Sequence, residues 1–450
     1  MRALFVRILF IYPNLSHELI GYGDLGAIAE PLALEYLAAS CVDLATEMEL
    51  LDLRLHPNEL NNRLTIFNPD VIAITGYSMH VMRIQEIAQL SRQRLPSSKV
   101  VVGGHHATLL AEDFKIPEID FIVVGEGTAP FAKLIKLFSD ESENSSVPGV
   151  WKNTHSGWEF GGDQSELQLD QVAPPLRSLC IDDRSHYFID WMKPIALMRT
   201  TVGCPYRCTF CSLWKMMDGY YYKREVDAVI TELKEIKEPY VFLVDDEPFV
   251  NSKRMDVLAD SIRESGIQKE YFSYCRIDTL LRNKSTLKKW VDIGLRRVFL
   301  GIEGITEDEI ENYNKGLSIA QIEEGLKAAR ELGLKIFASF IVNPNYSKAD
   351  FTRLSRFIER NRIDYPSFTI LTPLPGTDDF IQQYDQITAW QSNHRPDWSK
   401  WDLQHLVVPS NLSPREFEKE YKNLRRNFRG AYEIHQRKAI AARDDLTLTI

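Results

Sequence analysis

Three closely spaced cysteines are the strongest chemical signal in the sequence. Cys204, Cys208 and Cys211 form a C-x3-C-x2-C pattern. Thiolates at this spacing can hold three irons of a [4Fe–4S] cluster, which normally takes four cysteines. The fourth iron is then open to the amine and carboxylate of a small molecule and can pass it one electron. We therefore predict an iron–sulfur cluster with these three metal ligands.

A zinc site, a disulfide framework and plain core burial fit these cysteines less well. Structural zinc takes four ligands, usually in paired C-x2-C knuckles, and no second knuckle or histidine pair stands nearby. A disulfide framework is unusual in a chain of this size that we expect to lack a signal peptide. Plain core burial is disfavoured because the intervening residues suit an exposed loop: Pro205, Arg207 and Thr209. The other cysteines are scattered, and either Cys180 or Cys275 as a fourth ligand would contradict the open iron.

The elements around this loop predict an incomplete barrel over residues 191–380. Six apolar strands alternate with helices, and we expect them at residues 194–200, 240–244, 271–275, 297–301, 335–342 and 367–371. Barrels of such βα units place their chemistry at the carboxyl ends of the strands. The cysteine loop follows the first strand, so it falls at that end.

The first 139 residues also alternate strands and helices. Short apolar strands at residues 7–12, 48–53, 69–75, 99–103 and 121–125 predict a parallel sheet with right-handed crossovers. Glycines cluster after these strands: Gly76, Gly103, Gly104, Gly125 and Gly127. Ligands of open parallel sheets lie beyond the carboxyl ends of the strands, and glycine lets them approach the backbone. The fold class is therefore α/β, with a Rossmann-like domain before the barrel.

Two further segments complete the predicted organisation. Residues 140–190 read as a polar linker with a hairpin at residues 150–160. Residues 381–450 read as a small helical cap that packs on the barrel. The cap contains a charged helix at residues 414–436 and three tryptophans: Trp390, Trp398 and Trp401.

Composition limits the possible partners. The 450 residues carry a net charge of -10, from 53 Lys and Arg against 63 Asp and Glu, and contain no dense basic run. Nucleic acid is therefore not expected as a substrate. No stretch approaches the roughly 20 apolar residues of a membrane helix. We expect a cytoplasmic protein whose only membrane involvement is contact with a membrane surface.

The cysteine loop after a first barrel strand resembles that of the radical S-adenosylmethionine enzymes. The resemblance implies that the open iron holds the methionine part of S-adenosylmethionine and that Phe210, before the third cysteine, packs near the adenine. Electron transfer from the cluster would cleave the sulfonium and give a 5′-deoxyadenosyl radical. That radical removes a hydrogen atom from an unreactive carbon.

The same resemblance implies further contacts with S-adenosylmethionine. Asp245, Asp246 and Glu247 follow the second strand, where the family binds the methionine ammonium, and the sequence does not choose among them. Four later positions match contacts to the carboxylate, ribose or adenine: Arg276, Glu303, Asn343 and Leu374 in the run Pro373–Thr377.

Residues 5–138 resemble cobalamin-binding domains. In that family the nucleotide tail of cobalamin enters a slot lined by a Ser or Thr and a Gly-Gly pair. The matching positions are Ser78, Gly103, Gly104, Gly125 and Glu126, with His105 as the best histidine for a cofactor contact. Many such domains carry Asp-x-His-x-x-Gly, whose histidine binds cobalt. Here that histidine position is Arg54, and His56 is displaced by two residues, so we predict no histidine ligand to cobalt.

Together the two halves resemble the cobalamin-dependent radical S-adenosylmethionine enzymes, closest to the hopanoid C-3 methylase group. The resemblance implies methylation of an unactivated carbon, a small-molecule or lipid-like substrate, and a donor such as flavodoxin or ferredoxin. It also implies a cavity shared between the domains. A ring-forming cyclase of the same architecture and a non-catalytic cobalamin or redox sensor remain alternatives.

Overall fold

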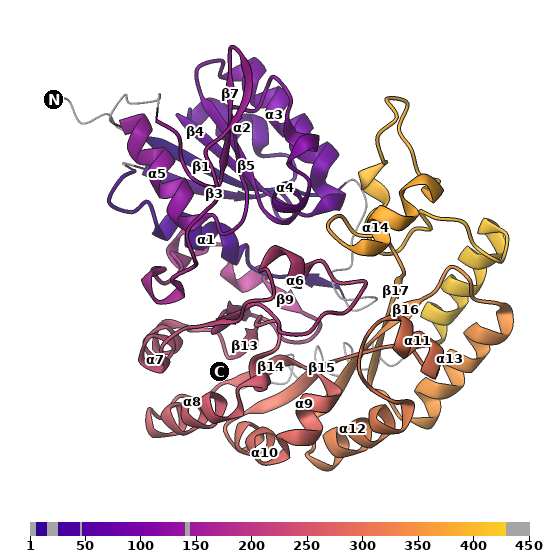
Figure 1. Cartoon of the computed structure of the whole chain (residues 1–450). Helices are drawn as coiled ribbons and strands as arrows, with labels where there is room; N and C mark the ends of the chain where they lie inside the picture. Colours follow the sequence, from indigo (N-terminus) through magenta and orange to yellow (C-terminus); the bar gives the residue numbers. More distant parts are fainter. Residues whose placement is uncertain (1–5, 16–25, 46, 140–144, 429–450) are drawn as a thin grey trace, which may run out of the picture.

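The computed structural model describes residues 6–15, 26–45, 47–139 and 145–428. The N-terminal domain lies beside the barrel, and the C-terminal segment runs along both (Figure 1). The predicted α/β fold is confirmed. The start of the polar linker, residues 140–144, and the end of the charged helix, residues 429–436, lie outside the described residues.

The N-terminal domain is built on a seven-stranded sheet in the order β3-β1-β4-β5-β6-β7-β8. The first five strands are parallel, and the predicted hairpin adds two antiparallel strands at the edge. The order changes direction between β1 and β4, where open sheets of this kind place their ligand crevice. The strands are β1 (Arg7–Tyr12), β3 (Glu47–Asp52), β4 (Val71–Thr75), β5 (Lys99–Gly103), β6 (Phe121–Val123), β7 (Val150–Thr154) and β8 (Gly157–Phe160).

Apolar side chains fill both faces of this sheet. Helices α2, α3 and α4 cover one face, and α1 and α5 cover the other. Helix α1 begins directly after Pro31 and ends at Ala39. The helices are α1 (Leu32–Ala39), α2 (Leu60–Ile66), α3 (Val81–Arg94), α4 (His105–Leu109) and α5 (Thr128–Ser139).

The second domain is an open barrel of six parallel strands in chain order, as predicted. Its strands are β10 (Ile195–Met198), β13 (Tyr240–Leu243), β14 (Glu270–Cys275), β15 (Leu295–Glu303), β16 (Lys335–Val342) and β17 (Tyr365–Ile370). Its helices are α7 (Val226–Glu235), α8 (Ser252–Glu264), α9 (Ile277–Arg282), α10 (Lys284–Asp292), α11 (Glu307–Asn312), α12 (Ile319–Glu331) and α13 (Lys348–Arg360).

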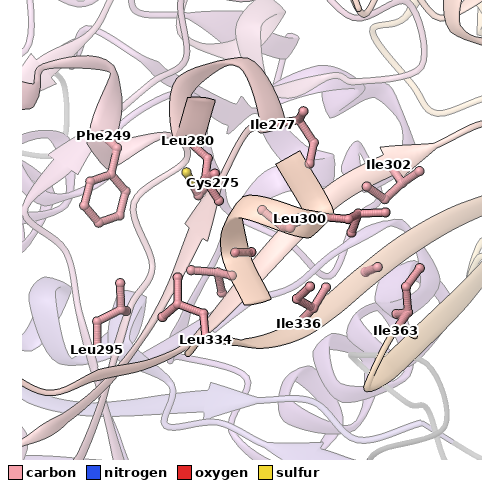
Figure 2. Packing of buried hydrophobic residues seen from close by; sticks show 14 of the residues in the cluster. Phe249, Cys275, Ile277, Leu280, Leu295, Leu300, Ile302, Leu334, Ile336 and Ile363 are labelled. Atoms are coloured by element: carbon pink, nitrogen blue, oxygen red, sulfur yellow. The ribbon is translucent and has the colours of Figure 1, made fainter. Parts of the chain in front are cut away.

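A large apolar layer lies between the barrel strands and their helices. Figure 2 shows part of it, including Leu300 and Ile336 from adjacent strands. Cys275 lies in the same layer near Leu280 and is 2% exposed. Its position is that of a small core side chain.

Buried ion pairs join the two domains. Arg177 Nη1 donates to Glu30 Oε1 at 2.6 Å, and its Nη2 donates to Glu232 Oε1 in α7 at 2.7 Å. Arg184 Nη1 donates to the second oxygen of Glu30 at 2.6 Å. A two-residue ribbon of β2 (Ala27–Ile28) and β9 (Phe188–Ile189) lies across the same junction. The linker segment therefore fixes how the domains face each other.

The C-terminal segment packs on both domains rather than on the barrel alone. Trp398 and Trp401 enter the core of the N-terminal domain, beside side chains of α3. The helix over residues 414–428 packs Phe417 and Tyr421 against the barrel layer. Between these parts lies α14 (Asp378–Gln383). None of the helices within the described ranges is long and apolar enough to cross a membrane.

Candidate active site

The cysteine loop begins directly after the two-residue strand β11 (Thr201–Val202), which pairs with β12 (Tyr222–Lys223). Gly203 has a φ of 93°, and a Cβ there would stand 2.0 Å from the Tyr220 carbonyl oxygen, so only glycine fits this turn. The short helix α6 (Leu213–Met216) ends the loop. The cysteines are thus held on an irregular loop at the carboxyl end of the first barrel strand.

The free thiols are largely shielded from solvent, and neighbouring thiols raise the pKa of two of them. Burial raises the pKa of Cys204 to about 12 and that of Cys211 to about 11, and neighbouring thiols contribute to both shifts. No three His, Cys, Asp or Glu side chains in the described parts of the chain converge on a single ion. A [4Fe–4S] cluster does not require such convergence, because each cysteine binds a different iron. Metal binding would supply the positive charge that these thiolates need.

The three acids after β13 have different surroundings. Asp245 is fully buried and accepts hydrogen bonds from the Thr200 amide at 2.6 Å and the Thr200 hydroxyl at 2.8 Å. Asp246 accepts from the Gly203 amide at 2.7 Å. Both carboxylates therefore hold the backbone that leads into the cysteine loop.

Glu247 is the acid that has a carboxylate oxygen free to accept a hydrogen bond from a ligand. Its Oε2 accepts from the Arg276 amide at 2.7 Å, whereas its Oε1 is buried and has no hydrogen-bond partner among the described residues. Burial raises the pKa of Glu247 to about 7. A buried acceptor without a partner is costly unless a ligand fills it, and an ammonium would do so. Of the three predicted acids, Glu247 fits this ligand best.

Arg276 lies between the acid and the cysteine loop. Its Nη1 is 3.6 Å from the Cys208 sulfur, its Nη2 donates to the Lys315 carbonyl at 2.6 Å and its Nε donates to Asp278 at 2.9 Å. The guanidinium is therefore held from three directions. A role toward the carboxylate of S-adenosylmethionine stays a prediction.

Glu303 closes the next strand in a strained conformation. Its φ is 68°, which is rare for a residue other than glycine and is often found at functional sites. Ser339 donates to its Oε2 at 3.1 Å, and Lys315 Nζ lies 3.7 Å from its Oε1. Burial raises its pKa above the ordinary value. Lys315 had no signal in the sequence, because it becomes part of the site only through the turn after α11.

A cavity of about 380 Å³ lies at the mouth of the barrel. The barrel contributes most of its wall, including Phe210, Cys211, Glu303 and Leu374. The N-terminal domain contributes His105. The predicted shared cavity is thus present, and it brings together residues from both halves of the chain. Asn343 is not part of this wall; its side chain accepts from the Asn345 amide at 2.9 Å.

His105 reaches from the N-terminal domain toward the cysteine loop. Its Nε2 lies 3.1 Å from the Ser212 hydroxyl, next to Cys211. Its Nδ1 is buried and has no hydrogen-bond partner within the described ranges. Burial lowers the pKa of His105 to about 4, so the ring is neutral near pH 7. A neutral, incompletely bonded imidazole facing the cavity fits a contact with a bound cofactor.

The glycine pair after β5 has little room for side chains. Gly104 has a φ of 99°, and a Cβ there would stand 2.5 Å from Thr75 Oγ1 and 2.9 Å from the Gly76 carbonyl oxygen. At Gly103 a Cβ would stand 3.4 Å from the Val123 carbonyl oxygen. These close contacts fit a slot in which a ligand must pass between backbone segments.

Ser78 is part of a buried hydrogen-bond chain that the sequence did not predict. Its hydroxyl lies 2.9 Å from His106 Nδ1, and His106 Nε2 lies 3.0 Å from Asp113 Oδ2. An ionised Asp113 accepts only, so His106 donates from Nε2 and accepts from Ser78. The Ser78 oxygen is then left as an acceptor for an amide of a ligand. The sequence singled out Ser78 and, next to His106, His105, but it contained no signal for Asp113.

The remaining predicted cobalamin positions lie at the end of β6. Gly125 has a φ of 80°, and a Cβ there would stand 3.0 Å from the Gln164 amide nitrogen. Glu126 accepts from the Thr128 amide at 2.9 Å, which caps the first turn of α5. His56 lies elsewhere, 2.8 Å from Asp183.

Comparison with known proteins identifies the same two domains. The family model "B12 binding domain" matches residues 20–135, and "Radical SAM superfamily" matches residues 198–358. The hopanoid C-3 methylase of Methylococcus capsulatus is 30% identical over 427 residues, covering 93% of this chain and 79% of that protein. The anaerobic magnesium-protoporphyrin IX monomethyl ester cyclase of Cereibacter sphaeroides is 25% identical and covers 94% of this chain and 70% of that protein.

A solved structure shares the whole architecture. The radical S-adenosylmethionine methyltransferase TsrM of Kitasatospora setae superposes with a TM-score of 0.69 at 18% identity, covering 93% of this chain and 85% of that chain. That structure contains cobalamin and a [4Fe–4S] cluster. The similarity at this identity shows a common fold. With both domains matched and a relative at 30% identity along most of the chain, the protein belongs to the cobalamin-dependent radical S-adenosylmethionine enzymes.

Proposed function

We propose that the protein methylates an unactivated carbon of a polycyclic, lipid-like substrate. The observation that supports this proposal is the cavity between the two cofactor sites. Its wall combines aromatic and aliphatic residues, such as Tyr274, Phe299, Ile341 and Leu371, with polar residues that include Ser339 and Thr369. Apolar surface with a limited number of placed polar groups suits a largely hydrophobic ligand. The relative named as a hopanoid methylase gives the substrate class.

The residues around the cavity have separate roles in this proposal. Glu247 binds the ammonium of S-adenosylmethionine, Phe210 packs on the adenine, and Glu303 accepts from the ribose hydroxyls. When bound, the cluster supplies an electron for cleavage of S-adenosylmethionine, and cobalamin supplies the methyl group. The apolar wall excludes water and holds the substrate carbon between the two cofactors. The reaction needs a single-electron donor, and the substrate is collected at a membrane surface.

The test is methyl transfer by the anaerobically reconstituted protein. S-adenosylmethionine with a deuterated methyl group is supplied with a hopanoid, and the lipid product is analysed by mass spectrometry. The proposal predicts a product that has gained the labelled methyl. Leu371→Trp, which fills part of the cavity, should lower product yield while leaving iron and cobalt content unchanged.

The cyclase is the second candidate, because the similarity to the Cereibacter sphaeroides protein also spans most of the chain. Magnesium-protoporphyrin IX monomethyl ester is therefore tested in parallel. A ring-closed porphyrin product, with no labelled methyl in either substrate, would contradict methylation. Iron and cobalt binding alone does not decide between the two reactions.

A further inference from the structure

The cysteine loop has an inner side and an outer side. Cys211 and Ser212 line the cavity, whereas Cys208 lies beneath side chains that reach the surface. The outer side is rich in arginine, tyrosine and tryptophan, residue types that are enriched at protein interfaces. Tyr220 is 56% exposed there, and the Arg282 side chain is 57% exposed.

Trp214 connects this surface to Cys208. Its indole N–H donates to the Cys208 carbonyl oxygen at 3.0 Å. Two cations lie over the same ring: Arg207 Cζ is 5.1 Å and Lys215 Nζ is 4.4 Å from the ring centroid. Arg207 is exposed to solvent. An aromatic ring thus separates surface cations from a predicted cluster ligand.

Tyr206 forms a second connection to the same cysteine. Arg282 Nη2 donates to the Tyr206 hydroxyl at 2.8 Å on the outer side. Arg276 stacks on the Tyr206 ring, with Cζ 3.7 Å from the centroid, and its Nη1 lies 3.6 Å from the Cys208 sulfur. Tyr206 of the loop and Trp214 of α6 therefore both stand between a surface arginine and Cys208.

The charge of this face differs from that of the whole chain. The protein carries a net charge of -10. Around the loop, Asp278 lies between two arginines, Arg276 and Arg282, and its side chain is only 15% exposed. Lys215 pairs with Asp378 at 3.0 Å, and Arg207 and Asp218 are both exposed nearby. An acidic partner would be repelled by most of the protein, whereas Arg207, Lys215 and Arg282 are exposed cations that can pair with its carboxylates.

We propose that this face is the docking surface for an acidic single-electron carrier protein with a reduced flavin or iron–sulfur centre. The face comprises Tyr206, Arg207, Trp214, Lys215, Tyr220 and Arg282. The inference rests on the cluster of the proposed function. In each encounter the carrier loses one electron and the cluster gains it, with no transfer of atoms. Trp214 and Tyr206 fill the space between the docked carrier and Cys208, so the electron enters away from the substrate cavity.

The test measures reduction of the reconstituted protein by flavodoxin hydroquinone in a stopped-flow instrument. Loss of the visible absorbance of the cluster gives the rate without any methylation assay. The double variant Arg207→Glu/Arg282→Glu should lower the second-order rate constant at least about ten-fold at low ionic strength. Added salt should slow the unmodified protein toward the rate of the variant, because it screens exposed charges.

Matched controls distinguish a loss of carrier docking from a loss of iron–sulfur cluster in the variants. Arg415→Glu/Lys419→Glu makes the same charge change on the exposed face of the C-terminal helix, and it should leave the rate unchanged. Dithionite, a small reductant, should reduce all variants at equal rates. Binding of fluorescently labelled flavodoxin to the metal-free protein gives the docking affinity even for a variant that loads iron poorly.

Three results would overturn the docking surface. One is an equal flavodoxin rate in both double variants, with equal reduction by dithionite. Another is unchanged flavodoxin affinity in the Arg207→Glu/Arg282→Glu protein. The third is loss of binding to phosphatidylglycerol vesicles with an unchanged flavodoxin rate, which would assign the face to a membrane. Failure of dithionite to reduce the unmodified protein would instead contradict the cluster, and with it the proposed function.

Discussion

The strand ends of the barrel and those of the N-terminal sheet meet at one cavity but carry different chemistry. On the barrel side, Glu247, Arg276 and Glu303 are buried, ionisable and held by hydrogen bonds. On the N-terminal side, Gly104 and Ser78 leave neutral backbone and hydroxyl groups, and His105 is uncharged near pH 7.

This difference follows from the two ligands. S-adenosylmethionine carries an ammonium, a carboxylate and a sulfonium, so its site needs opposite charges already fixed in place. Cobalamin is bulky and bears many amides, so its site needs open backbone and neutral hydrogen-bond partners. One side therefore recognises charge, and the other recognises shape. Changes on the two sides should have separable effects.

The largest effect is expected from removing a cluster ligand. Cys208→Ala leaves two of the three predicted thiolates, so iron content should fall and product formation should drop to background. Cobalamin binding should be retained. Iron analysis and cobalamin absorbance measure the two effects.

Cys275→Ala is the matched control, because Cys275 lies in the apolar layer of the barrel. It should keep its full iron content. Loss of iron in this variant would show a fourth cysteine ligand and would remove the open iron from the mechanism.

The next largest effect should come from a change in the predicted cobalamin slot. Gly104→Ala places a methyl group 2.5 Å from Thr75 Oγ1 at a positive φ. We expect a loss of about 1–3 kcal/mol in unfolding free energy, because the φ of 99° and ψ of -166° at Gly104 are almost restricted to glycine. We also expect a larger proportional loss of cobalamin affinity from closure of the slot. Denaturant unfolding and cobalamin titration measure the two quantities, and iron content should be unchanged.

Gly333→Ala serves for comparison, because Gly333 has a φ of 76° and no heavy atom lies within 4 Å of the place that the added methyl group would take. It should lose less stability, because its methyl group meets no neighbour, and it should keep full cobalamin affinity. If both variants bind cobalamin equally well, Gly104 does not line the slot.

Glu247→Gln tests the predicted binding of the S-adenosylmethionine ammonium by removing one charge. Loss of a charged hydrogen bond to the ammonium should cost about 2 kcal/mol, or roughly thirty-fold in the Kd of S-adenosylmethionine. Because the pKa of Glu247 is about 7, protonation below this value removes the carboxylate. Affinity of the unmodified protein should therefore fall as the pH decreases through 7, and the variant should lose this dependence. Isothermal titration calorimetry at several pH values measures both effects. A pH dependence in the variant equal to that of the unmodified protein would mean that another group binds the ammonium.

The smallest effect, on stability, is expected from the ion pair that joins the C-terminal segment to the N-terminal domain. Arg395 Nη1 donates to Asp113 Oδ1 at 3.1 Å, and its side chain is 46% exposed. Arg395→Met should cost at most about 1 kcal/mol of unfolding free energy, as is usual for exposed pairs. Arg94→Met on α3 gives the baseline for loss of an exposed arginine. A larger cost for Arg395 would mean that the Asp113–His106–Ser78 chain depends on this contact.

Local sequence patterns were sufficient to predict most of the framework. Strand β16 runs over Lys335–Val342 as expected, because a run of apolar residues interrupted only by Ser339 lies between two helical segments. The same holds for β1 and for the hairpin of β7 and β8. The three cysteines were identified by spacing alone. Their predicted role as ligands, and the roles of the other site residues, await the measurements above.

What the sequence could not predict depends on contacts between distant residues. Trp398 packs against His106, with ring centroids 4.7 Å apart, although nearly three hundred residues separate them. The choice of Glu247 among three acids depended on the hydrogen bonds of Asp245 and Asp246, which involve backbone amides of the cysteine loop and of the strand before it. No periodicity or motif encodes such pairings.

The late position of Trp398 and Trp401 has a consequence for synthesis of the protein. These side chains complete the apolar core of a domain whose other members are mostly translated more than two hundred residues earlier. At about 5–20 residues per second, the ribosome needs tens of seconds to produce them. During that interval the nascent N-terminal domain has an unfinished hydrophobic surface, so chaperone protection should matter most while the barrel is still being translated.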